Sequence, residues 1–315
     1  MSLKYEGKFY NHFENQEYKV KFEKKGLKEA SYYKKEDNLL LRYRARIPEF
    51  VFPKTNLTIR YFKEGSGEYV LNGKRLKVRN DRFLIMNPND GWEYINENNG
   101  YVDILSFAVC DEMASKYNFY VTEKYEQLLD NPFGEEKEES YFMETMLAAS
   151  HYSTGRLLKS IYDLSNKFDF YFTCPYELTI EILQSLYKEQ ALGYKMVGEI
   201  NAKKTSTKLE TLKRLLVAYE FIHDNIGKPI SIEELATISS LSKFHLYDSF
   251  KRAFGKTPHQ YINRLKIAKA KNALQNTDAS VSEISDSFGF SDPEVFSKVF
   301  KKVYGKPPSN YLIAN

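Results

Sequence analysis

Along the front part of the chain, from about residue 26 to residue 109, apolar and polar residues alternate in short runs. This two-residue period is typical of strands with one buried face. The run Leu39–Ile47 places apolar residues at every second position and sets Arg42, Arg44 and Arg46 between them. Three arginines on one strand face cannot all be buried without partners. This face is therefore either solvated or meets an anionic ligand.

Turn signals separate the expected strands. Asn72-Gly73 stands between Gly67–Leu71 and Lys74–Arg79, and an Asn-Gly pair favours a tight type I′ hairpin. A second turn-linked pair is predicted at Arg82–Asn87 and Trp92–Ile95. Many short strands with frequent turns predict a small β-barrel or jelly roll.

The apolar spacing becomes helical after about residue 111 and stays so to about residue 197. The runs Tyr141–Ala149, Arg156–Lys167 and Tyr176–Gln190 have this spacing. The last run has an apolar face wide enough to pack on its own domain or on a second subunit. Residues 201–207 are polar and predict a linker, and a further helix is expected over 208–225.

The last hundred residues contain a duplication. Ser231-x-x-Glu234 recurs as Ser280-x-x-Glu283, and Phe250-Lys251-Arg252 recurs as Phe300-Lys301-Lys302. A serine followed three residues later by a glutamate is a capping-box signature for the start of a helix. Each copy then predicts a short helix, a tight turn and a second helix, which is the helix-turn-helix arrangement, at about 231–254 and 280–304.

The turns of the two copies differ, since Ser240 stands where the second copy has Gly289. A positive φ at this position would cost the serine roughly 1–2 kcal/mol. Between the copies, Pro258–Asn276 predicts one amphipathic helix of roughly 28 Å. This length suits a strut that holds two second helices in successive major grooves, about 34 Å apart.

The second helix of each copy has an apolar face and a polar face. The polar faces are either solvated surface or the contact to DNA, and their recurrence at one register favours DNA. Late lysines and arginines on such a helix reach phosphates, while earlier residues meet base edges. The candidate DNA-binding residues are Lys243, Phe244, Tyr247, Asp248, Lys251 and Arg252 in the first copy, and Glu294, Ser297, Lys298, Lys301 and Lys302 in the second.

These residues resemble the DNA-binding domain of the AraC family of bacterial transcription regulators, from about residue 208 to the end. The match is carried by Ile232-x-x-Leu235-Ala236, Leu241-Ser242-x-x-His245-Leu246, Phe250-Lys251, Gly255-x-x-Pro258-x-x-Tyr261, Ile284, Gly289-Phe290, Phe296-Ser297-x-x-Phe300-Lys301-Lys302, Gly305-x-Pro307-Pro308 and Tyr311. Asp248 departs from it, because the family often has arginine there. An acidic side chain cannot contact phosphate, but it can accept from a cytosine amino group. Lys298 is the better candidate for direct readout of guanine.

The strand region also resembles the cupin-like sensor domain that many AraC-family proteins carry. The expected fold is therefore α+β: a cupin-like barrel or jelly roll with helices over 1–200, the linker, and an all-α bipartite helix-turn-helix domain over 208–315. The resemblance implies a homodimeric transcription regulator that responds to an effector. Its expected partner is double-stranded DNA, and RNA polymerase and a small-molecule effector are candidate further partners. Candidate effector-binding residues in the barrel interior are Tyr43, Arg60, Tyr61, Tyr69, Met86 and Trp92.

A barrel enzyme of the cupin type is the main rival, with the helical tail serving protein contacts. Such enzymes hold a metal through barrel histidines, yet all five histidines lie outside the strand region. We therefore expect no catalytic residue, no metal and no cofactor. A third alternative is a front domain that binds no small molecule and only dimerises.

Charge, cysteine content and hydrophobic runs limit which classes of protein and which cellular locations fit this sequence. Residues 205–315 carry a net charge of +5 and the remainder −1, so the basic excess lies with the duplication, as expected for a phosphate partner. Cys110 and Cys174 offer neither a disulfide framework nor metal spacing, and both are predicted to be buried thiols. Because no secretory leader opens the chain and no apolar run approaches 18 residues, we expect a cytoplasmic protein without a membrane span.

Overall fold

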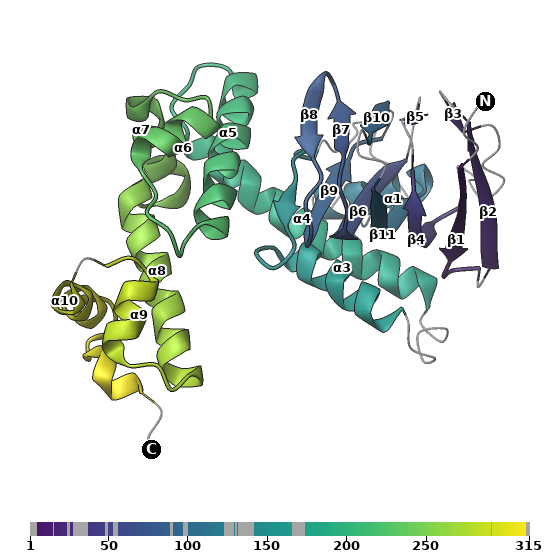
Figure 1. The fold of residues 1–315 in the computed structure, drawn as a ribbon. Helices are drawn as coiled ribbons and strands as arrows, with labels where there is room; N and C mark the ends of the chain where they lie inside the picture. The colour runs from purple at the N-terminus through teal and green to yellow at the C-terminus, as the bar shows by residue number, and fades with distance from the viewer. Residues whose placement is uncertain are drawn as a thin grey trace. The chain divides into compact units, whose positions relative to one another are not determined.

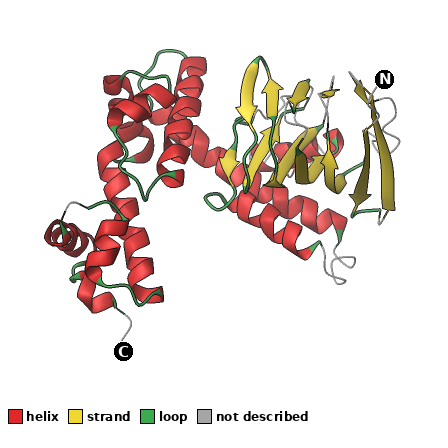
Figure 2. Cartoon of the chain, viewed as in Figure 1, coloured by secondary structure: helices red, strands yellow, loops and turns green. Residues whose placement is uncertain are grey.

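The computed structural model describes residues 5–14, 16–23, 26–27, 37–47, 50–52, 56–88, 91–96, 100–122, 129, 131, 142–165, 174–290 and 292–312. It divides the chain into two compact units, Met1–Leu192 and Gly193–Asn315. Figure 2 shows strands backed by helices in the first unit and helices alone in the second. In its described part, the chain has no helix that is both long enough and apolar enough to span a membrane.

Two antiparallel sheets form the first unit (Figure 1). The larger sheet has the strand order β12 (Leu147–Ala148), β9 (Arg82–Met86), β6 (Leu57–Glu64), β11 (Tyr101–Val109), β4 (Leu39–Arg46), β1 (Tyr5–Asn11), β2 (Gln16–Glu23) and β3 (Gly26–Leu27). The smaller sheet has the order β5 (Phe50–Phe52), β10 (Trp92–Ile95), β7 (Glu68–Leu71) and β8 (Lys74–Lys77).

Strand alternation builds one core on each face of the larger sheet. On β4, Leu39, Leu41 and Tyr43 pack with the small-sheet residues Tyr69 and Trp92. The intervening Leu40 belongs to a second core, which the helices α3 (Ser153–Leu164) and α4 (Pro175–Glu199) complete. Partly buried residues of α1 (Asp111–Thr122) pack against that second core. Because successive side chains of a strand point to opposite faces, β4 serves both cores.

The expected hairpin at Asn72-Gly73 is confirmed. Strands β7 and β8 pair across it, and both turn residues have positive φ, 48° and 75°. The second expected pair was wrong, because β9 lies in the large sheet and β10 in the small one. The described strands form two separate sheets and not a closed ring. The barrel and the cupin-like jelly roll therefore stay predictions. The expected order of strands followed by helices is observed.

Two further segments differ from the sequence-based expectation. Strands β1 and β2 precede residue 26, where the strand region was expected to begin. The predicted helix over 141–149 was wrong where it is described, since residues 142–146 have no regular structure and β12 follows. The Asn87 side chain donates to the Phe142 carbonyl (2.8 Å) and accepts from its amide (2.7 Å). These two hydrogen bonds hold the segment extended.

The second unit consists of α5 (Thr205–Asp224), α6 (Ile232–Ile238), α7 (Lys243–Phe254), α8 (Pro258–Asn276), α9 (Val281–Ser287), α10 (Pro293–Tyr304) and the 3-10 helix η2 (Pro308–Tyr311). Helix α5 begins three residues before the predicted start at Lys208. Both predicted helix-turn-helix arrangements are present, as α6–turn–α7 and α9–turn–α10. Figure 1 shows α8 joining them.

Local chemistry at the helix ends is similar in the two copies but not identical. Ser280 and Glu283 form a complete capping box, whereas only the Ser231 half is made in the first copy. Gly255 and Gly305 end α7 and α10 in the left-handed region. The turn residues Ser240 and Gly289 have φ of 53° and 65°. Ser240 therefore carries the backbone strain considered above, about 1–2 kcal/mol, which Gly289 avoids.

Candidate nucleic-acid interface

The helices α7 and α10, which we call the recognition helices, each rest on a buried aromatic face. Leu246 and Phe250 of α7 and Phe296 and Phe300 of α10 are fully enclosed. In the first copy, Phe250 and Phe254 contact Tyr261, and in the second Phe300 and Tyr304 contact Tyr311. Burial of these rings fixes the rotation of each helix, which leaves the opposite face in solvent.

The exposed face of α7 carries two aromatic side chains and several charged residues, some of which form ion pairs within the protein. Phe244 is 84% exposed and Tyr247 41%. Arg252 donates from Nε to Asp248 Oδ2 at 2.8 Å. Lys243 forms an ion pair with Glu233 of α6. An acidic residue therefore occupies part of the basic face in the first copy, and it holds the nearest arginine.

The exposed face of α10 is less constrained. Lys298 has a side-chain exposure of 79%, and its Nζ lies 4.0 Å from Glu294 Oε2. Lys301 and Lys302 are exposed in the last turn. Ser297 is half-buried beside them. The structure thus places all the predicted DNA-binding residues on these two helices, with an acidic residue in the middle of α7 and another in the first turn of α10.

The predicted effector residues do not form one cluster. Tyr43, Tyr69, Met86 and Trp92 belong to the core between the two sheets. Arg60 joins them: its guanidinium donates to Tyr69 OH at 2.7 Å and lies 4.2 Å from the Trp92 ring centroid. Five of the six candidates are therefore neighbours.

Tyr61 lies on the opposite face of the sheet, in the core that the helices cover. Its hydroxyl donates to Asp81 Oδ1 at 2.7 Å, and Asp81 also pairs with Lys159 of α3. Burial and the Asp81 hydrogen bond raise the pKa of Tyr61. Adjacent strand residues point to opposite faces, so Tyr61 could not join Arg60.

The arginine row on β4 is divided. Arg42 donates to Tyr162 OH at 2.9 Å and to Ser165 Oγ at 3.2 Å. Arg44 and Arg46 are exposed, and the Arg46 guanidinium lies 4.4 Å from the Tyr101 ring centroid. One arginine is thus paired within the protein and two face solvent. Of the cysteines, Cys110 is buried as expected, but Cys174 is exposed. No group of metal-binding side chains gathers among the described residues.

The known proteins compared below each match about a third of the chain or less. A family model described as a helix-turn-helix domain matches residues 235–313. The probable transcriptional regulator LumQ of Photobacterium leiognathi is 33% identical over 104 residues, which are 33% of this chain and 42% of that protein. The Msm operon regulatory protein of Streptococcus mutans is 34% identical over 92 residues, 29% of this chain and 33% of that protein.

The chain therefore spans less than half the length of either relative. A solved structure of an AraC-type DNA-binding protein from Chromobacterium violaceum is 28% identical, covers 31% of this chain and 88% of that one, and has a TM-score of 0.30. By their names, both relatives are regulatory proteins. The duplicated motifs, the family model and the relatives agree that the C-terminal part of this chain is a helix-turn-helix domain similar to those of bacterial transcription regulators.

Proposed function

We propose that this chain regulates transcription by binding duplex DNA with both recognition helices, each in one of two successive major grooves. The recurrence of an exposed basic face on both helices, opposite equivalent aromatic cores, carries the proposal. Lys251 and Arg252 of α7 match Lys301 and Lys302 of α10. Like-placed positive charge on two helices fits a periodic polyanion, and DNA presents the same groove geometry every turn.

We assign different tasks to the residues of these faces. Lys251, Arg252, Lys301 and Lys302, in the last turns, contact phosphates. Phe244 and Tyr247, which are exposed earlier in α7, pack on base edges such as the thymine methyl group. Lys298 donates to guanine. The carboxylate of Asp248 accepts a hydrogen bond from a cytosine amino group and is held in place by Arg252. The remaining predicted residues flank these positions: Lys243, Glu294 and Ser297.

Lys298→Ala and Lys301→Ala should separate base reading from phosphate contact. The first should relax specificity at one base pair by about 1–3 kcal/mol. The second should weaken specific and random DNA alike and lower the salt slope of binding by about one. Titration of both DNAs at several salt concentrations measures each effect, with Lys306→Ala, an exposed lysine beyond α10, as control. If Lys298→Ala weakened both DNAs equally, Lys298 would not read a base. If wild-type protein showed no salt-dependent binding, the proposed function would fail.

We further propose that the first unit binds a small effector between its two sheets and forms a homodimer, and that RNA polymerase is a partner. The arginine at the sheet interface supports the effector site, because Arg60 places a polar group among Tyr69, Trp92 and other apolar side chains. Ligand sites commonly have this composition. A thermal-shift screen of sugars and organic acids on the full chain should find a stabilising compound that Arg60→Met no longer recognises. A screen without such a compound would favour a front unit that only dimerises.

A further inference from the structure

A cation reaches the tight turn of each helix-turn-helix from the helix that precedes it. In the first copy, Arg214 of α5 donates from Nη1 to the Ser240 carbonyl oxygen at 3.0 Å. In the second, the Lys266 Nζ of α8 lies 3.4 Å from the position that a Cβ on Gly289 would take. Ser240 and Gly289 are the two residues with positive φ in these turns.

Ring contacts show that Arg214 and Lys266 occupy equivalent positions. Tyr219, on α5, contacts Phe254 and Tyr261 at 5.2 and 5.4 Å. Lys271, on α8, lies over Tyr304 and Tyr311, which are the copies of those two rings, at 4.6 and 5.2 Å. Tyr219 is five residues after Arg214, and Lys271 is five residues after Lys266. The duplication therefore includes the preceding helix and its cation.

Both cations retain unused hydrogen-bonding capacity. Lys266 is only 7% exposed, and its ammonium lies 5.8 Å from the Phe290 ring centroid. It has no hydrogen bond or ion pair to another described residue. Burial lowers the pKa of Lys266. Arg214 donates to Glu210 and to Ser240, which leaves guanidinium N–H groups over. A buried ammonium without an acidic partner is unfavourable. An anion from outside the chain would supply the missing partner.

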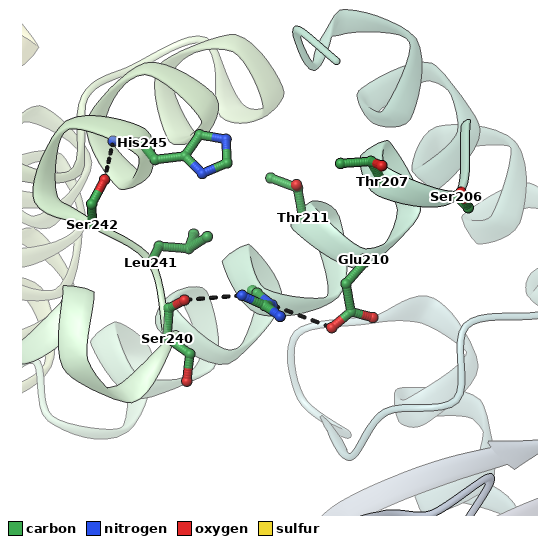
Figure 3. Close-up of a pocket in the computed structure, with 9 residues that line it drawn as sticks. Ser206, Thr207, Glu210, Thr211, Ser240, Leu241, Ser242 and His245 are labelled. Carbon is green, nitrogen blue, oxygen red and sulfur yellow. Dashed lines mark hydrogen bonds and ion pairs between the residues drawn. The ribbon is translucent and has the colours of Figure 1, made fainter. Parts of the chain in front are cut away.

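An open pocket lies beside the cation of the first copy (Figure 3). Ser206 and Thr207 line it from the first turn of α5, and Ser242 and His245 line it from the start of α7. Arg214 and Glu210 also line the pocket, and the Arg214 guanidinium donates to Glu210 and to the Ser240 carbonyl oxygen. No side chain caps α5, so its first amide groups have no such acceptor. The uncapped N-terminus of α5, the hydroxyl groups and the Arg214 guanidinium together favour a phosphate group. The N-terminus of α7 is already capped by the Ser242 side chain.

The pocket borders the proposed DNA-reading face of α7. At about 100° per residue, His245 lies roughly 60° around the helix from Asp248, whereas the buried Leu246 and Phe250 lie on the far side. A recognition helix in the major groove is flanked by the sugar-phosphate backbone. The pocket therefore opens where a backbone phosphate would run and not toward the protein core.

We propose that this pocket receives one backbone phosphate of the bound DNA with Arg214 as its cationic ligand, and that Lys266 contacts the equivalent phosphate beside the second recognition helix. This inference rests on the proposed function and adds two phosphate contacts that lie outside the recognition helices.

Lys266→Met gives the sharpest test, because it removes the ammonium and keeps the apolar stem. If the buried ammonium gains its anionic partner only when DNA is bound, the ammonium does not stabilise the free protein. The variant should then unfold at the same urea concentration as wild type or at a higher one. Its affinity for the specific DNA site should fall by about tenfold. Arg264→Gln removes an exposed cation of the same helix and serves as control. Wild-type affinity of Lys266→Met would overturn the proposal for the second copy.

Thr207→Asp tests the pocket without touching the Arg214–Ser240 hydrogen bond. A carboxylate in the first turn of α5 favours the helix but repels a phosphate, so stability should hold while affinity falls by about tenfold. Neutral methylphosphonates placed singly along the DNA locate the contact. A methylphosphonate at one position should weaken DNA binding by the wild-type protein. The same substitution should not weaken binding further in Thr207→Asp or Arg214→Gln. Additive losses at every position would overturn the pocket. Absence of specific binding by wild type would instead refute the proposed function itself.

Discussion

Ala268→Pro should reduce the affinity for a full DNA site by about a hundredfold while leaving the affinity for the half-site of the first helix-turn-helix nearly unchanged, because α8 packs in the core of the second one. Ala268 is an exposed residue in the interior of α8. Proline there removes one helical hydrogen bond and clashes with the preceding turn, which costs about 3 kcal/mol in a regular helix. The two recognition helices then lose their fixed spacing. Binding of two linked units exceeds that of one by about 10²–10⁴ only when the linkage fits both sites.

The matched control is Ala268→Gln, which keeps a good helix former at this exposed position. Titrations with the full site and with each half-site, for both variants, measure the effect of the linkage. Equal losses on the full site and on the half-site of the first helix-turn-helix would mean that α8 does not set the spacing. Unchanged affinity of Ala268→Pro for the full site would show that only one unit contacts DNA.

Phe300→Ala should destabilise the second helix-turn-helix by about 3–5 kcal/mol. Phe300 is fully buried and contacts Phe296, Tyr304 and Tyr311, so its removal leaves a cavity at the centre of that core. Urea unfolding of the full chain should show an early transition, with loss of specific binding before the remaining structure unfolds.

Val303→Ala, on the same helix, is the control for Phe300→Ala because Val303 is 41% exposed. It should change the stability by less than about 0.5 kcal/mol. An unfolding curve of Phe300→Ala that overlays the wild-type curve would contradict the assignment of this core.

The second unit followed closely from sequence because local signals agreed with one another. Caps at Ser242 and Ser280, the glycine ends at Gly255 and Gly305, and the recurring aromatic positions each fix a helix boundary or a buried face. The positive φ of Ser240 could be inferred only by comparison with Gly289. The half-formed capping box at Ser231 shows that a signature does not guarantee both hydrogen bonds.

The first unit followed less closely because long-range pairing decides it. Alternation identified β4 and β6, but it could not assign β9 and β10 to different sheets. The alternation also could not show that Arg60 faces the core between the two sheets and Tyr61 the core under the helices, because it does not reveal which face of the sheet the helices cover. The signal for Arg214 and Lys266 was present in sequence, five residues before Tyr219 and Lys271, but it became visible only through their ring contacts.

Selection of bound DNA from a random pool by the full chain tests the central claim most directly. If both recognition helices read DNA from one chain, the recovered sequences should contain two short motifs whose centres are about 10–10.5 base pairs apart. The motif under α10 should be the better defined, since Lys298 is held only by a long 4.0 Å ion pair with Glu294, whereas Arg252 is bound to Asp248 at 2.8 Å. Recovery of a single motif, or of no enriched sequence, would contradict the account.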